Sequence, residues 1–253
     1  MEKTWLKQYP AGVPGTIDVE QYASLVALLD ESFRKYGDRN AYKFMGKAIT
    51  FAQVDDASRA LAAYLQSLGL EKGDRVAVMM PNVPQYPVAV AAILRAGYVV
   101  VNVNPLYTPR ELEHQLKDSG AKCILIVENF AATLSQVMAA VPTQHVIVTA
   151  VGDMLGFPKS MIVNYVLRKV KKAVPAFHIP GIVHFNQAIA QGRGKTFKPA
   201  TVVPPVYCST AMSSGPTVAG WKVLPRPCAI AWLKCTMPGM WNAGTAFFTL
   251  RST

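Results

Sequence analysis

Four short runs of apolar, mostly β-branched residues recur within the first 150 positions of the chain. They are apolar at nearly every position instead of alternating with polar residues, which is typical of strands covered on both faces. Segments with helical periodicity separate them, so we expect an α/β fold with a mostly parallel sheet. The expected strands cover residues 75–80, 98–103, 122–127 and 145–150.

The segments between these runs carry apolar residues at helical spacing. We expect helices over residues 24–36, 50–68 and 88–96 and another that begins at Pro109. Two of them open on a capping box, in which a pair of side chains satisfies free N–H groups of the first turn. The capping pairs are Thr50 with Gln53 and Thr108 with Glu111. A hairpin turning at Met45 and Gly46 is expected over residues 41–49.

A basic amphipathic segment follows at residues 161–174. The pattern predicts a helix, and two interpretations of its cations remain open. It forms either a surface helix with a solvated basic face or a helix that rests on an anionic membrane. The cations that would contact lipid are Arg168, Lys169, Lys171 and Lys172.

Charge is distributed unevenly along the 253 residues, whose net charge is +11. Residues 1–153 hold all 15 acids, whereas residues 154–253 hold 12 Lys and Arg and no acid. A basic half can indicate nucleic acid or membrane, but no nucleic-acid motif accompanies it, so we expect no nucleic-acid partner. No apolar run reaches about 18 residues, which favours a cytoplasmic protein. Peripheral association with the inner face of the cell membrane is the alternative location. The four cysteines lack metal-site spacing and are expected to be free thiols.

A specific resemblance is carried by residues 102–116, Asn-Val-Asn-Pro-Leu-Tyr-Thr-Pro-Arg-Glu-Leu-Glu-His-Gln-Leu. Together with residues 73–77 and 95–97, this run resembles the N-terminal subdomain of bacterial long-chain fatty acid–CoA ligases, a branch of the AMP-forming adenylating enzymes. The likeness extends from residue 1 to about residue 204. We therefore expect residues 1–200 to be the N-terminal part of an AMP-binding domain, an incomplete sheet-and-helix subdomain of the family's large domain.

The resemblance implies a reaction, its cofactors and a substrate. Members of the family use ATP and Mg²⁺ to adenylate a fatty acid, and coenzyme A then displaces AMP. Their chemistry depends on a glycine-rich phosphate loop and on later acidic, arginine and lysine motifs. The family is about twice as long as this chain, so we expect no catalytic residue here.

Residues 213–222 stand where the family has its phosphate loop. A degraded loop of this kind would hold nucleotide phosphates only weakly, because Val218 replaces a turn-forming glycine and Lys222 stands one place late. The candidate cofactor-binding residues are Ser213, Ser214, Gly215 and Thr217.

From residue 201 onward the composition changes. Three of the four cysteines and three of the four tryptophans lie in residues 201–253, which contain no acid and no clear periodicity. A frameshift would produce such a tail. Residues 207–210, Tyr-Cys-Ser-Thr, can be encoded so that a one-base shift yields Leu-Gln-Tyr, which the family has just before its phosphate loop. We expect residues 201–253 to be an irregular, non-homologous tail.

Three functional hypotheses follow. The first is a truncated long-chain fatty acid–CoA ligase that is inactive alone. The second is an α/β module that binds lipid or a membrane without catalysis. The third is a truncated product without function, whose exposed apolar sheet surface would favour aggregation.

Overall fold

The computed structural model describes residues 4–16 and 22–200. The seven α-helices of that part are α1 (Leu25–Lys35), α2 (Phe51–Gln66), α3 (Gln85–Arg95), α4 (Pro109–Ser119), α5 (Ala131–Val137), α6 (Lys159–Tyr165) and α7 (Phe185–Arg193). Its strands are β1 (Asn40–Phe44), β2 (Lys47–Thr50), β3 (Arg75–Met79), β4 (Val99–Asn102), β5 (Cys123–Val127), β6 (His145–Thr149) and β7 (Val183–His184). Short turns are η1 (Thr4–Gln8), η2 (Glu128–Phe130), η3 (Met138–Ala140) and η4 (Val166–Val170).

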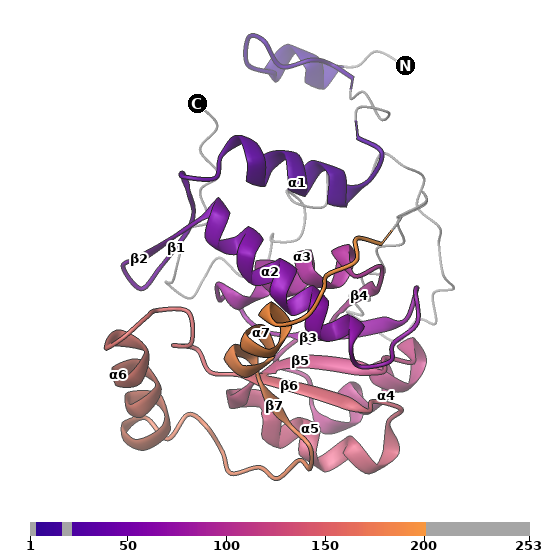
Figure 1. Cartoon of the computed structure of the whole chain (residues 1–253), viewed down its shortest axis with the longest axis vertical. Coiled ribbons are helices and arrows are strands. Elements are labelled where there is room, and N and C mark those ends of the chain that lie inside the picture. The colour runs from indigo at the N-terminus through magenta and orange to yellow at the C-terminus, as the bar shows by residue number, and fades with distance from the viewer. Residues whose placement is uncertain (1–3, 17–21, 201–253) are drawn as a thin grey trace.

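The main sheet is parallel, with the strand order β4-β3-β5-β6-β7 (Figure 1). All four strands expected from the apolar runs are present in it, which confirms that prediction. The fifth strand, β7, was not expected because it has only two residues, paired as Ile147 with Val183 and Val148 with His184. The separate hairpin of β1 and β2 is also confirmed, and Met45 and Gly46 both have positive φ, as a tight hairpin turn requires.

Helices cover both faces of the sheet. In β5 all five side chains are buried, and they alternate between two hydrophobic cores. Cys123, Leu125 and Val127 pack with α2, α3 and α7, whereas Ile124 and Ile126 pack with α4 and α5. The result is a layered α/β/α arrangement, as the continuous apolar runs predicted.

Both predicted capping boxes form. The Gln53 N–H donates to Thr50 Oγ1 at 3.3 Å, and the Thr50 N–H donates to Gln53 Oε1 at 3.0 Å. At α4 the Thr108 N–H donates to Glu111 Oε2 at 2.8 Å, and this backbone hydrogen bond lowers the pKa of Glu111. The two boxes fix where α2 and α4 leave the preceding strands.

The helix expected over residues 161–174 differs from the prediction. Regular α-helix ends at Tyr165, and η4 continues it as a π-helical turn to Val170. The Lys171 N–H donates to the Val166 carbonyl at 2.8 Å, which is the i→i+5 bond of such a turn. The extra residue in the turn changes the direction of the side chains after Tyr165.

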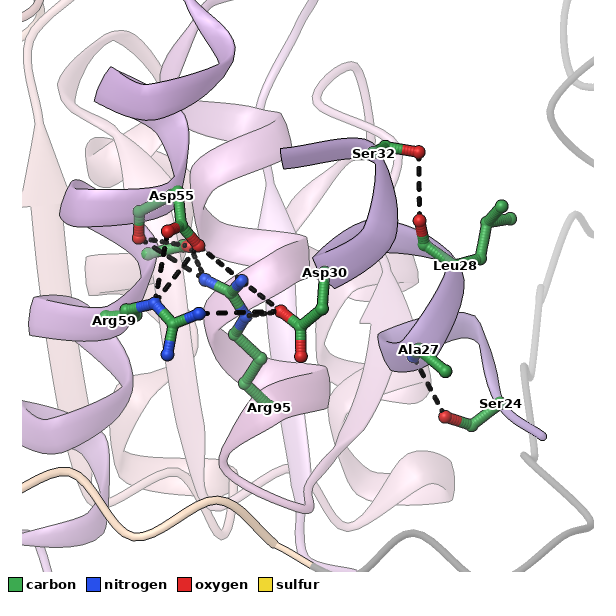
Figure 2. Close-up of polar contacts among 9 residues, drawn as sticks. Ser24, Ala27, Leu28, Asp30, Ser32, Asp55, Arg59 and Arg95 are labelled. Carbon is green, nitrogen blue, oxygen red and sulfur yellow. Dashed lines mark hydrogen bonds and ion pairs between the residues drawn. The ribbon is translucent and has the colours of Figure 1, made fainter. Parts of the chain in front are cut away.

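A buried arginine ties the first three helices together. Arg95, at the end of α3, is 2% exposed and contacts Asp30 of α1 and Asp55 of α2 (Figure 2). Its Nη1 also donates to Ser58 Oγ at 2.6 Å, and its guanidinium carbon lies 4.8 Å from the centre of the Phe33 ring. These contacts satisfy a charge that would be costly to bury alone.

The helices α2 and α7 approach so closely that a side chain is excluded between them. A Cβ added at Gly192 would lie 1.8 Å from the Ala60 carbonyl oxygen. Only glycine permits this contact, which holds α7, and with it β7, against α2.

Replacing Arg95 with leucine should lower the free energy of unfolding by about 3 kcal/mol, because Asp30 and Asp55 lose their buried partner. The value is at the low end for a broken pair because both carboxylates are partly exposed. Arg59→Leu is the matched control, since Arg59 contacts the same two carboxylates from a 47% exposed position and should cost less than about 1 kcal/mol. Urea unfolding followed by circular dichroism measures the free energy of unfolding of both variants. If Arg59→Leu lowers it as much as Arg95→Leu does, Arg95 is not the buried partner that stabilises the two carboxylates.

Gly192→Ala should destabilise the fold by about 3 kcal/mol, because the added methyl group forces α2 and α7 apart. Gly194→Ala provides the comparison, as the nearest atom to its added Cβ is 3.6 Å away. That change should stay within about 0.5 kcal/mol. The same urea titration applies, and a Gly192→Ala protein as stable as Gly194→Ala would show that the close contact is wrong.

Candidate functional site

The carboxyl ends of the parallel strands meet at one edge of the sheet, where open α/β proteins bind ligands. Polar side chains lie at the end of four of the strands or follow them there. Gln85 begins α3 after β3, Asn102 ends β4, Glu128 follows β5, and Thr149 ends β6. This carboxyl edge is the candidate functional site within residues 22–200.

Gln85 and Thr149 form one buried network at this edge. Gln85 Nε2 donates to the Ala150 carbonyl at 2.8 Å and to Thr149 Oγ1 at 3.2 Å. Thr149 Oγ1 donates in turn to Asp153 Oδ2 at 3.0 Å. Asp153 Oδ2 also accepts a hydrogen bond from the Ala150 N–H at 2.8 Å. The network fixes the start of α3 against the turn after β6, whereas the buried Gln85 Oε1 has no hydrogen-bond partner among the described residues.

Glu128 forms an ion pair at this edge, held by hydrogen bonds through both of its carboxylate oxygens. Its carboxylate is only 6% exposed and accepts from Arg168 of η4, with Nε–Oε1 at 3.0 Å and Nη2–Oε2 at 2.6 Å. This hydrogen-bonded pairing raises the pKa of Arg168. Arg168, expected on a basic face with Lys171 and Lys172, is thus paired with the protein, although its side chain remains 46% exposed.

The Asn-Val-Asn-Pro-Leu-Tyr-Thr run that carries the family resemblance has a local structural role. Asn102 Oδ1 accepts from the Tyr86 hydroxyl at 3.0 Å, and its carbonyl accepts from Gln115 Nε2 at 2.9 Å. Asn104 Oδ1 accepts from the Leu106 N–H at 3.0 Å, which shapes the turn into α4. These contacts end β4 and direct the chain across the sheet.

Within residues 4–16 and 22–200, no three His, Cys, Asp or Glu side chains cluster as metal ligands do. The acids at the carboxyl edge are Glu128, paired with Arg168, and Asp153, which accepts several hydrogen bonds. We therefore assign no chemical step to this edge.

The predicted phosphate-binding residues Ser213, Ser214, Gly215 and Thr217 lie outside the described residues, as does the predicted tail 201–253. The networks of Gln85 and Glu128 were not predicted. A usable signal existed in each case, because Glu128 and Thr149 directly follow buried apolar runs at the end of a strand. Their partners Arg168 and Asp153 could be identified only from the folded structure.

Cys123 is a free thiol in the centre of the sheet and is fully buried. Burial raises its pKa to about 12. The expectation of a free thiol holds for this cysteine, and it lies too deep to act as a nucleophile.

Comparison with known proteins identifies the family. A family model described as AMP-binding enzyme matches residues 29–200, more than half of the chain. This chain belongs to the AMP-binding enzyme family.

None of the helices among its described residues combines the length and apolar content needed to cross a membrane.

Curated relatives narrow the resemblance. The chain is 52% identical over 204 residues to the long-chain-fatty-acid–CoA ligase of Salmonella typhimurium, covering 80% of this chain and 36% of the relative. It is 37% identical over 161 residues to the corresponding ligase of Bacillus subtilis, covering 64% and 29%. The resemblance to part of a long-chain fatty acid–CoA ligase is thus confirmed. The chain spans about a third of the length of the curated relatives it matches.

Solved structures confirm the fold. The adenylation domain of a carboxylate reductase from Mycobacterium chelonae superposes with a TM-score of 0.56 at 18% identity, covering 78% of this chain and 32% of that one. A long-chain-fatty-acid–CoA ligase from Archaeoglobus fulgidus gives 0.50 at 24% identity, covering 68% and 34%. At such identities the likeness concerns the fold alone, which is the α/β arrangement of an adenylating enzyme.

The Cys123 thiol should not react with Ellman's reagent in the native protein at pH 8. A pKa of about 12 leaves about one thiolate in ten thousand at that pH, and the reagent has no access to the buried sulfur. A variant in which Cys208, Cys228 and Cys235 are replaced by serine isolates this thiol. One thiol should become reactive when urea unfolds that variant, whereas rapid modification in native buffer would contradict the burial.

Proposed function

We propose that this chain is the N-terminal part of a long-chain fatty acid–CoA ligase. The observation that supports it is about 50% identity to curated ligases of that name over four-fifths of the chain. In the complete parent protein, ATP, a fatty acid and coenzyme A would yield acyl-CoA, AMP and diphosphate. Fatty acid would be the substrate, and ATP, Mg²⁺ and coenzyme A would bind only to the complete enzyme.

The part of the chain that the structure describes would act as scaffold. Its carboxyl-edge groups are engaged in holding α3, the turn after β6, and η4. Stabilisation of transferred phosphate charge, which usually dominates such catalysis, would have to come from other groups. Ser213, Ser214, Gly215 and Thr217 would supply little of it, because Val218 occupies a glycine position of the loop. We therefore expect this chain alone to be inactive.

The domain boundary at residue 200 is part of the same proposal. Residues 1–200 would be the N-terminal part of the AMP-binding domain, and residues 201–253 would be read out of frame. The family match that ends at residue 200 supports this division, as does the absence of acids from residues 201–253.

Peripheral contact with a membrane is a second candidate function, with the protein on its cytoplasmic side. The specific observation is that Lys169, Lys171 and Lys172 are exposed in a region without acids, since residues 154–253 contain none. Arg168 would contribute less, because Glu128 holds its guanidinium. Anionic headgroups attract such clusters.

The test compares this chain with a protein whose reading frame is restored. The gene, read one base out of phase from near the Val206 codon, should encode a glycine-rich phosphate loop and the remaining ligase. The restored protein should exchange diphosphate into ATP when fatty acid and Mg²⁺ are present, and should form acyl-CoA.

This chain alone should do neither above a no-protein blank. Acyl-CoA formation by the chain itself would refute the predicted inactivity. A gene without such a frame would show that the tail is a true extension, and an inactive restored protein would count against the ligase assignment.

A further inference from the structure

The segment of residues 157–172, which we call the arm, exposes a cluster of large apolar side chains. It comprises α6, η4 and their flanking residues, and in Figure 1 α6 lies apart from the layers that enclose the sheet. Five of the ten large apolar side chains that are exposed among the described residues belong to it. They are Phe157 at 85%, Met161 at 64%, Ile162 at 60%, Tyr165 at 63% and Val170 at 66% exposure. Such a concentration in a short segment marks an interaction surface.

The arm has a defined inner and outer side. Met161, Ile162 and Tyr165 lie on one face of α6, since they are three or four residues apart or adjacent, whereas Val163 and Asn164 are partly buried. Asn164 Oδ1 accepts from the Gly152 N–H at 2.8 Å. A Cβ at Gly152 would lie 2.6 Å from that oxygen, so the helix sits directly on the turn after β6.

Two further contacts fix the arm at its far end. Arg168 reaches the buried Glu128 carboxylate, and Asn129 Nδ2 donates to the Ala173 carbonyl at 2.9 Å. Glu128 and Asn129 directly follow β5, and Ala173 directly follows the arm, so the arm is anchored to the carboxyl edge at β5 and β6. Anchoring on both sides holds the apolar face outward in the absence of any partner.

The charge around the apolar face favours an anionic partner. Lys169, Lys171 and Lys172 are exposed, and no carboxylate among the described residues forms an ion pair with them. A second copy of the chain meeting this surface about a twofold axis would bring the same lysines together, which is unfavourable. Aliphatic side chains such as those of Met161 and Ile162 suit the acyl boundary of a bilayer better than a nucleic acid.

We propose that the arm is a membrane-docking surface. Phe157, Met161, Ile162 and Tyr165 enter the boundary between headgroups and acyl chains, and the three lysines contact anionic headgroups. Arg168 acts as an anchor to Glu128 and does not touch lipid. This inference rests on the second candidate function above and adds that apolar insertion, in addition to charge, provides the binding.

The test is co-sedimentation of the full chain with vesicles of phosphatidylcholine alone or mixed with phosphatidylglycerol. The unmodified protein should bind the mixed vesicles, and binding should weaken in high salt. Ile162→Ser combined with Tyr165→Ser should lower the partition coefficient roughly tenfold or more, because two inserting side chains are lost. Lys171→Gln combined with Lys172→Gln should also weaken binding to the mixed vesicles.

Leu106→Ser is the matched control, since Leu106 is 81% exposed but lies outside the arm, and it should bind as the unmodified protein does. Thermal unfolding verifies that each variant is folded.

If the variant with both Ile162→Ser and Tyr165→Ser binds normally while high salt abolishes binding, the contact with the vesicles is electrostatic only and apolar insertion is refuted. Binding to neither vesicle refutes membrane contact altogether. Concentration-dependent dimers that the serine pair abolishes would identify the surface as a self-association interface. The ligase assignment depends on none of these results.

Discussion

The architecture depends on the burial of β5 on both faces. Because its five consecutive side chains are all buried, each face of the sheet must be covered by helices. The chain meets that requirement by placing α2, α3 and α7 over one face and α4 and α5 over the other. Because the strands are also parallel, the connections between them have to cross over the sheet, which accounts for the alternation of strands and helices along the sequence.

Much of this arrangement could be predicted from the sequence, because its signals are local. The four apolar runs, both capping boxes and the hairpin at Met45 and Gly46 follow from patterns a few residues long. The π-helical turn of η4 and the two-residue strand β7 could not be predicted, since tertiary contacts determine them. Arg95 illustrates the same limit. A cation in the last turn of α3 suits the helix dipole at a solvent-exposed end, yet it is buried against α1 and α2.

The candidate site was predictable only in outline. Family resemblance placed the nucleotide chemistry beyond residue 200, outside the part that the structure describes. Within that part, polar residues at the ends of β5 and β6 hold the chain together. Glu128 and Asp153 lie where parallel sheets often bind ligands, and their hydrogen bonds are directed to Arg168 and to the turn after β6. Position at a carboxyl edge therefore does not by itself make a residue catalytic.

The shortness of β7 affects how the protein meets its own copies. An edge strand normally presents a row of free N–H and C=O groups on which another chain can add a strand. Here the strand pairs through only two residues before the chain turns into α7. A neighbouring molecule could make few ladder hydrogen bonds along so short an edge, so growth of the sheet into fibrils from this side is discouraged by the geometry of the chain itself.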